Sequence, residues 1–321
     1  MPVSFSLTAS RFWSAYWITM RPYLLFVSGV AGMVGIAASG AGLIRSVAAF
    51  AAFLLSYGFG QALTDCFQTD TDSLSSPYRP LVRGIVSRAD VLRVSLAGLA
   101  LCSVLLIALN PWAIIPACMA VSGLATYTHF KRRWWAGPWY NAWIVALLPL
   151  MGRLAGGGAE SAGLVVGTPP LIPFILSVFF GYTNFVLMGY FKDISADRAS
   201  GYDTFVVRFG WIRAAVGTDV LSIATVAASA WGFVRHGTGE TVPAALVLIA
   251  GWVVLLAAQI GIHRVRTEQA SHGPIANVVR GFVLVHIAAA ILFRPAWLLA
   301  AALFYAAFEL ALATRPERSQ V

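Results

Sequence analysis

The run SVAAFAAFLLSYGFGQALT at residues 46–64 contains no Asp, Glu, Lys or Arg. An α-helix of this length is about 28 Å long, close to the roughly 30 Å of a bilayer's hydrocarbon core. No water is available there to bind exposed backbone groups, and a helix satisfies those groups within one segment. The run therefore predicts a membrane-spanning helix.

Similar apolar runs recur along the whole chain. The expected spans are residues 22–41, 46–64, 91–109, 111–128, 138–155, 169–190, 212–233, 242–262, 277–293 and 296–313. Only Arg294-Pro295 separates the last two, so they are either two spans or one kinked helix. The sequence predicts an all-α, polytopic membrane helical bundle of nine or ten spans, forming a single domain over residues 1–321.

The composition excludes a soluble protein. Hydrophobic residues make up 59% of the chain and charged residues 11%, against roughly 25% charged in a typical soluble domain, and this difference decides the class. Too few charges remain to cover a soluble surface, which excludes soluble Rossmann enzymes and disordered scaffolds. The same composition excludes a secreted disulfide framework, and the three cysteines, Cys66, Cys102 and Cys118, form no CxxC pair and no Cys/His metal spacing.

The basic residues predict the orientation. A net charge of +9 would suggest nucleic acid in a soluble protein, but in a membrane protein Lys and Arg gather on cytoplasmic loops. With a cytoplasmic N-terminus, only Arg45, Arg153, Arg235 and Arg294 lie on the opposite side. We therefore expect an integral protein of a bacterial inner membrane, with its N-terminus and long charged loops in the cytoplasm and no nucleic-acid partner.

A first polar window follows the 46–64 span. If the helix continues to Asp72, the side chains of Asp65, Gln68 and Asp72 share one face at positions i, i+3 and i+7. Mg²⁺ takes oxygen ligands, often one or two carboxylates plus substrate phosphates. Arg79, within Pro77-Tyr78-Arg79-Pro80, supplies a cation for such a phosphate.

A second window follows the 169–190 span. Asp193 and Asp197 lie at i and i+4, flanked by Lys192 and Arg198 as candidate diphosphate partners. A solvated loop with ordinary ion pairs is the alternative for either window alone. Two such windows at cytoplasmic span ends favour a functional site, because acidic residues near membrane depth are costly.

A third window runs from Tyr127 to Lys131-Arg132-Arg133. Three consecutive cations suit a diphosphate, although they are also typical of a simple cytoplasmic anchor. Together the windows predict two divalent metals and several cations around a diphosphate. The bundle, with 20 Phe, 11 Trp and 10 Tyr, would hold a hydrocarbon tail. An isoprenoid diphosphate fits both halves.

These windows resemble the motifs of the UbiA superfamily of intramembrane prenyltransferases. The family's Asn-Asp-x-x-Asp-x-x-x-Asp and Pro-x-Arg-Pro elements match Thr64 to Asp72 and Pro77 to Pro80. Its Tyr-x-x-x-Lys and Asp-x-x-x-Asp motifs match Tyr127 to Lys131 and Asp193 to Asp197. Arg21-Pro22, before the first span, also resembles the family. The resemblance implies a helical bundle, usually of nine spans, around a central cavity that opens laterally to lipid.

Two positions depart from the family pattern. Thr64 replaces the family's Asn, and Gln68 replaces its middle Asp. Gln still offers one neutral oxygen to a metal, but a charge is lost. Asp70 lies about 140° from Asp65 on an ideal helix and compensates only if the helix unwinds there. The change leaves the number of metals open, but not the class of reaction.

The resemblance implies Mg²⁺-dependent transfer of a prenyl group from a prenyl diphosphate to an aromatic acceptor within the membrane. The expected partners are these two substrates and membrane lipid. The implied metal ligands are Asp65, Gln68, Asp72, Asp193 and Asp197. The implied partners of the leaving diphosphate are Arg79, Lys131 and Lys192. Aromatic candidates to shelter an allylic cation are Tyr127, Tyr182, Tyr190 and Trp139.

Some roles stay open. Asn141 and Asn184 are candidates to orient the acceptor or to bond across helices. A membrane terpene cyclase would use the same diphosphate site, with the cation attacking its own tail. A transporter is disfavoured, because the charged groups cluster at one face and not at the bilayer midplane.

Overall fold

The computed structural model describes residues 4–157, 169–237 and 241–315, and these residues form helices and no strand. The helices are α1 (Ser10–Met20), α2 (Leu25–Ser39), α3 (Leu43–Asp65), α4 (Thr69–Ser75), α5 (Arg88–Leu109), α6 (Ile114–Arg133), α7 (Gly137–Gly157), α8 (Ile172–Gly189), α9 (Ile194–Ala199), α10 (Phe205–Phe209), α11 (Trp211–His236), α12 (Val242–Arg264), α13 (His272–Phe293) and α14 (Leu298–Ala313). Short 3₁₀ turns lead into α2, α6, α8, α13 and α14.

The expected membrane bundle is confirmed. Within the described ranges, nine helical segments are long and apolar enough to cross a membrane. α7 is not among the nine, because it carries Asn141 and Arg153, but it is 21 residues long and packs between α2 and α8. α13 and α14 are separate helices that break at Arg294-Pro295, so this region is two segments and not one kinked helix.

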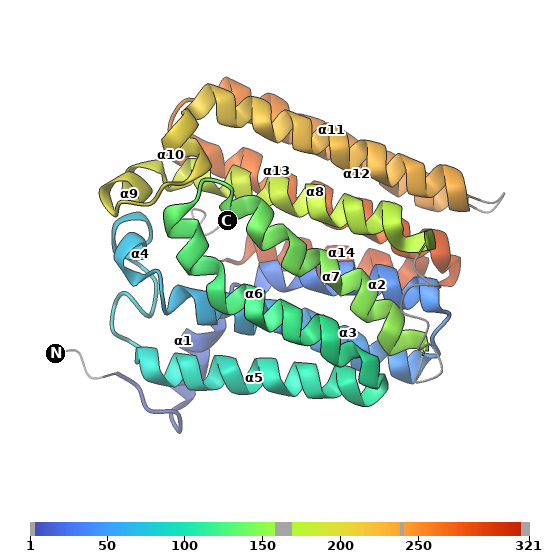
Figure 1. Cartoon of the computed structure of the whole chain (residues 1–321), viewed down its shortest axis with the longest axis horizontal. Helices are drawn as coiled ribbons and strands as arrows, with labels where there is room; N and C mark the ends of the chain where they lie inside the picture. Colours follow the sequence, from blue (N-terminus) through green and yellow to red (C-terminus); the bar gives the residue numbers. More distant parts are fainter. Residues whose placement is uncertain (1–3, 158–168, 238–240, 316–321) are drawn as a thin grey trace.

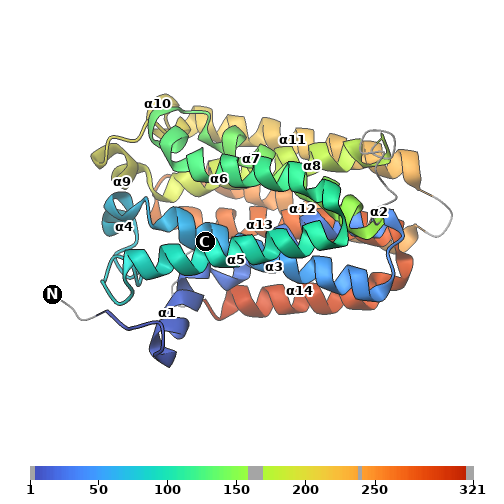
Figure 2. The same ribbon diagram turned by 60° about the horizontal axis from the view of Figure 1, so that its bottom comes forward.

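The long helices lie side by side, and the short helices α4, α9 and α10 gather at one end of the bundle (Figures 1 and 2). α2, α7, α8 and α13 form the centre, while α11 and α12 pack on one side and α5 and α6 on the other. α14 buries only Phe308 and Leu312 fully and runs back toward the end that holds α4. This end, referred to below as the polar end, collects the predicted windows.

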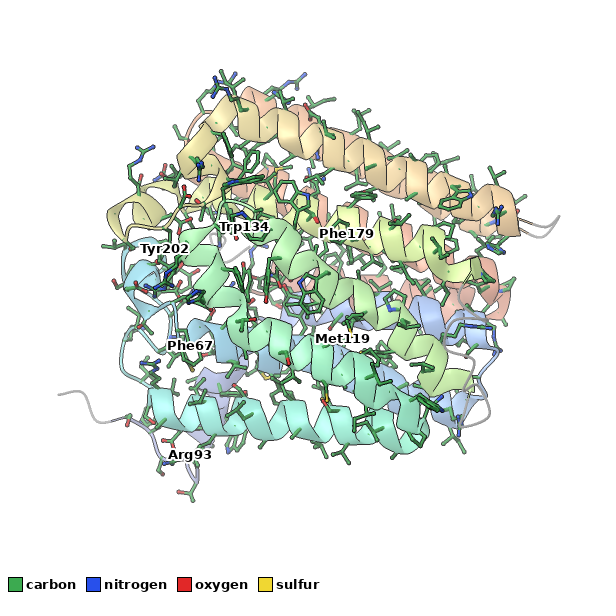
Figure 3. The ribbon with its side chains drawn as sticks, viewed as in Figure 1. Phe67, Arg93, Met119, Trp134, Phe179 and Tyr202 are labelled. Atoms are coloured by element: carbon green, nitrogen blue, oxygen red, sulfur yellow. The ribbon has the colours of Figure 1, made fainter. Side chains whose placement is uncertain are left out.

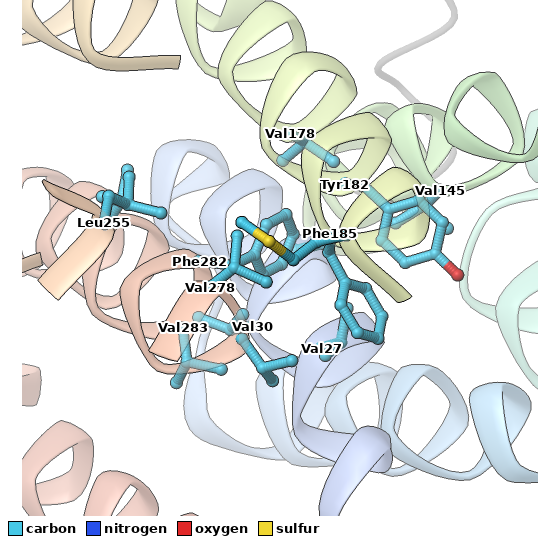
Figure 4. Close-up of a cluster of buried hydrophobic side chains, with 14 of the residues drawn as sticks. Val27, Val30, Val145, Val178, Tyr182, Phe185, Leu255, Val278, Phe282 and Val283 are labelled. Atoms are coloured by element: carbon cyan, nitrogen blue, oxygen red, sulfur yellow. The ribbon is translucent and has the colours of Figure 1, made fainter. Parts of the chain in front are cut away.

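The main core joins the central helices to α12. Val27 of α2, Phe185 of α8, Leu255 of α12 and Phe282 of α13 belong to one buried cluster (Figure 4). Lipid is as apolar as these side chains, so close helix packing must provide much of the association. Small residues permit it where α2 crosses α7, because a Cβ at Gly35 would overlap the carbonyl oxygen of Pro149.

Candidate active site

The two acidic windows lie on short helices that contact each other at the polar end. α4 carries the end of the first window, α9 carries the second, and the two helices are neighbours (Figure 1). Phe67, before α4, and Tyr202, after α9, lie at this end too (Figure 3). Windows that are more than 100 residues apart in sequence therefore build one site.

The helix of the second span does not continue to Asp72, which was the condition for Asp65, Gln68 and Asp72 to share one helical face. α3 ends at Asp65, and α4 starts afresh at Thr69. At the break, Arg132 Nη2 donates to the carbonyl oxygen of Phe67 at 2.9 Å. The first window is therefore assembled by a turn and not by one helical face.

Arginines neutralise both carboxylates of the first window. Arg21 Nη2 donates to the two oxygens of Asp65 at 2.9 and 3.1 Å, and Gln61 Nε2 donates to Asp65 Oδ1 at 2.7 Å. Arg79 forms an ion pair with Asp72. Burial raises the pKa of Asp72 above its ordinary value, against the opposing charge of Arg79. Arg21 was not among the predicted site residues, although the Arg21-Pro22 pair was a signal.

The third window separates into an inward cation and outward cations. Lys131 is buried, and its Nζ donates to Gln68 Oε1 at 2.8 Å and lies 5.4 Å from the ring centre of Tyr190. Arg132 instead pairs with Asp70 at 2.8 Å on the surface, where this pairing lowers the pKa of Asp70 despite some burial. Asp70 is therefore engaged outside the acidic cluster. Because Lys131 is buried against Gln68, it does not act merely as a positive charge that anchors a cytoplasmic loop.

The second window contains a carboxylate without a hydrogen-bond partner. Asp197 is fully buried, and neither oxygen makes a hydrogen bond of ordinary geometry to a described residue, although the Thr204 hydroxyl lies near. Burial raises the pKa of Asp197 to about 7, against the nearby charge of Lys131. A buried anion left in this state is suited to a cation ligand.

One cavity of about 230 Å³ joins the polar end to the interior, far larger than the voids of a packed core. Its polar end is lined by Arg21, Gln68, Thr71, Asp72, Arg79, Tyr127, Lys131, Tyr190, Lys192 and Asp193. Its interior continues between α3, α5, α6 and α7, and Leu106, Ala117 and Met151 are among the residues farthest from the polar end. The shape suits a charged head and a long apolar tail.

The predicted site residues differ in whether they line the cavity. Asn141 and Tyr182 line the cavity, with Tyr182 Oη 3.2 Å from Tyr57 Oη. Asn184 does not line it, because it shares the face of α8 that Gly181 packs against Phe282. Arg198 is exposed and lies outside the cavity lining. The structure therefore does not bring Asn184 or Arg198 to this cavity, and their assignment to substrate binding stays a prediction.

Trp139 does not line the cavity either, because its ring packs against Trp135 and Phe205. Asp65 and Asp197 are also absent from the lining. Both are nevertheless linked electrostatically to the groups that line it: Asp65 to Arg21, and Asp197 to Lys131 and Asp193.

The metal-ligating side chains of the site fit a divalent metal only if waters or substrate phosphates complete its coordination. Within the described part of the chain, no three His, Cys, Asp or Glu side chains group closely enough to enclose a metal alone. Mg²⁺ commonly keeps waters and takes one or two carboxylates together with substrate phosphates. The unpartnered Asp197 and the cavity-lining Asp193 match that pattern.

Comparisons with known proteins agree with this architecture. The chain is 29% identical over 213 residues to digeranylgeranylglyceryl phosphate synthase of Thermococcus kodakarensis, covering 65% of this chain and 74% of the relative. The Halobacterium salinarum enzyme of the same name is 27% identical over 246 residues, covering 75% and 82%. These relatives are archaeal, so they do not support the expectation of a bacterial membrane.

Solved structures share the fold. A UbiA homologue from Aeropyrum pernix K1 superposes with a TM-score of 0.71 at 21% identity, covering 82% of this chain and 96% of that one. A UbiA homologue from Archaeoglobus fulgidus, bound to DMAPP and Mg²⁺, gives 0.64 at 20% identity, covering 93% and 99%. The model of the UbiA prenyltransferase family matches residues 24–278. The chain therefore belongs to the UbiA prenyltransferase family and is an integral membrane prenyltransferase.

Proposed function

We propose that the protein transfers a prenyl group from a prenyl diphosphate to a hydroxyl of a glycerophosphate-type lipid, with Mg²⁺ as its metal. The observation that carries this is the continuous cavity, which joins buried cations and carboxylates to an apolar interior. The polar end would face the cytoplasm with the N-terminus, and the whole bundle would act as one catalytic unit.

Asp193 and Asp197 would hold Mg²⁺. Asp193 and Asp72 line the polar end of the cavity, and Asp197 is buried without a hydrogen bond of ordinary geometry to a described residue. When bound, the ion would supply a Lewis acid for the oxygen of the departing diphosphate. The Mg²⁺ in the Archaeoglobus fulgidus homologue supports this choice of metal.

The cations at the polar end would stabilise the leaving group. Arg79, Lys131 and Lys192 line the cavity together with Arg21, and ion pairs or packing hold them in place before substrate arrives. Fixed charges aimed at developing negative charge need no reorganisation during the reaction. They would bind the diphosphate as the allylic carbon–oxygen bond breaks.

The carbon side of the cleaved bond becomes an allylic cation. Tyr127, Tyr182 and Tyr190 line the cavity, and Tyr127 Oη lies 3.2 Å from Tyr190 Oη. Aromatic faces attract a cation most strongly where water is excluded. These rings would shelter the cation until a nucleophile attacks.

The acceptor is proposed from the relatives. Their names specify a glyceryl phosphate product and not a prenylated ring, so the aromatic acceptor expected from the sequence has no support from them. Asn141 lines the cavity and would orient the acceptor hydroxyl. The oxygen of the acceptor hydroxyl would form the new carbon–oxygen bond, and its proton would pass to an oxygen of the released diphosphate.

The test is an assay of the purified protein in detergent with Mg²⁺ and geranyl, farnesyl or geranylgeranyl diphosphate. Reactions with a prenylated glyceryl phosphate, with a panel of phenols and without an acceptor are compared. Their products are identified by mass spectrometry. A new ether on the glyceryl phosphate is expected. A prenylated phenol would overturn the acceptor class, and a cyclic hydrocarbon formed without acceptor would identify a cyclase.

Replacing Asp193 by Ala should lower kcat by at least about a hundredfold, in line with the loss of one preorganised charge-stabilising group. Asp219→Ala is the matched control, because Asp219 of α11 pairs with His263 of α12 and does not line the cavity. Equal activity in the Asp193→Ala variant and the wild type would remove the second window from the mechanism.

A further inference from the structure

Gln68 occupies the middle position of the first window, and its side-chain oxygen already has a cationic partner. Lys131 Nζ donates to Gln68 Oε1 at 2.8 Å, and both side chains are buried. A divalent ion on the same oxygen, at about 2.1 Å, would lie beside this ammonium. Like charges repel strongly where the surroundings are poorly polarisable. Lys131 and a metal therefore compete for Gln68.

Asp65 is also engaged by protein cations. Its oxygens accept two hydrogen bonds from Arg21 and one from Gln61, and Arg79 lies 3.7 Å away. Arg21 is the one non-glycine residue in the described chain with a positive φ, at 52°. Such a conformation persists only where the surroundings hold it, and strained residues concentrate at functional sites.

The second window is in the opposite state. Both oxygens of the fully buried Asp197 lack a hydrogen bond of ordinary geometry to the described residues, although the Lys131 ammonium and the Thr204 hydroxyl lie near. Asp193, four positions earlier in sequence, lines the cavity. Within the described part of the chain, Asp197 therefore has no hydrogen-bonded cation, whereas Asp65 and Asp72 each pair with an arginine. The place left for a metal ion lies in the second window. In the first window, cationic side chains of the protein already pair with the carboxylates and with Gln68.

We infer that this site takes a single divalent cation, held by Asp193 and Asp197, and that the Lys131 ammonium on Gln68 takes the place of a second ion. Arg21, Arg79 and Lys131 then bind the diphosphate directly. This inference rests on the proposed function, since it assumes that the ligand is a diphosphate.

The test counts bound Mn²⁺ by electron paramagnetic resonance, with inorganic diphosphate present and no prenyl substrate or acceptor. The wild type should bind one ion per protein. Asp193→Asn and Asp197→Asn should each bind none, and the control Asp219→Asn should still bind one. The double variant Gln68→Asp/Lys131→Met, which restores a carboxylate and removes the competing ammonium, should bind two.

The outcomes separate this inference from the proposed function. Two ions in the wild type would overturn the inference and leave a metal-dependent prenyltransferase intact, whereas no ion would overturn both. One ion retained by the second-window variants would overturn its placement. One ion in the double variant would overturn the role of Lys131. If Asp197→Asn fails to fold, Asp193→Asn still decides, because Asp193 is only partly buried.

Discussion

Asp197 illustrates how burial without a partner sets the chemistry of one residue. Its carboxyl is fully buried, which raises its pKa to about 7 from an ordinary value of 3.8. At a pH between these two pKa values, the metal-free folded state holds one more proton than the unfolded state. Stability conferred by this proton is present at low pH and is lost as pH rises toward 7.

Metal binding should have the opposite pH dependence, because a ligand carboxylate must be deprotonated. Below pH 7, we expect Mn²⁺ affinity to fall by about tenfold per pH unit as Asp197 takes up a proton. The measurement is Mn²⁺ titration with diphosphate between pH 5.5 and 8. Affinity that stays constant across this range would show that Asp197 is already ionised at the lower pH.

Metal-free thermal melts provide an independent check. The wild type should lose stability relative to Asp197→Asn as pH rises from 5 to 8, because only the wild type then carries an unpartnered buried charge. Parallel pH profiles for the two proteins would contradict the raised pKa.

At the scale of single elements, α2 and α7 depend on small residues. Gly35 faces the carbonyl oxygen of Pro149, and a Cβ at Gly152 would overlap the carbonyl oxygen of Gly32. The backbones of the two helices are therefore nearly in contact. Overpacking of this kind typically costs about 1–3 kcal/mol.

Gly35→Ala should therefore lower the thermal stability in detergent clearly, and Gly152→Ala should do the same. Gly273→Ala is the control, because it lies near the start of α13 with no heavy atom near its Cβ position. The comparison uses melting temperatures by circular dichroism. Equal melting temperatures for Gly35→Ala and Gly273→Ala would refute the close α2–α7 contact.

The length of α6 predicts the length of the substrate tail. Lys131 lies at the polar end and Ala117 is fourteen residues deeper, about 21 Å along the helix. One prenyl unit adds four carbon–carbon bonds of about 1.5 Å, about 5 Å when extended. The channel therefore has the length of about four prenyl units.

Substitutions at the deep end should change tail preference in opposite directions. Ala117→Leu fills the channel and should favour a donor shorter by one prenyl unit, whereas Leu106→Ala empties it and should favour a longer one. The measurement is kcat/KM across geranyl, farnesyl, geranylgeranyl and longer diphosphates. A preference unchanged in both variants would place the tail elsewhere.

At the scale of the whole molecule, the site closes only when distant parts of the chain meet. α4 and α9 contact each other at the polar end, and α6 contributes Lys131 between the two windows. A ligand held by all three links the early and late parts of the bundle. Its binding should therefore stabilise the entire fold and not one helix.

Mg²⁺ and diphosphate together should raise the melting temperature by several degrees, because a ligand at a hundred times its Kd adds about 2.7 kcal/mol. Either one alone should give a smaller shift, and Asp193→Ala should abolish the combined effect. Differential scanning fluorimetry in detergent measures it. Additive, independent shifts from the two ligands would indicate separate sites.

The sequence by itself determined the membrane bundle, because apolar length and the absence of charge are local properties. It also indicated both acidic windows and Lys131. It did not reveal the break after Asp65, where the Phe67 carbonyl oxygen accepts a hydrogen bond from Arg132 of α6, a contact between residues 65 positions apart in sequence.

Only the tertiary structure decided which polar side chains share the cavity. Asn141 lines it while Asn184 does not, and Arg21 joins Asp65 across 44 positions of sequence. Arg132 and Lys131 are neighbours in sequence, yet one pairs on the surface and the other is buried on Gln68. The physical reason is that helix rotation and packing fix the direction of each side chain, and both depend on contacts between helices that are distant in sequence.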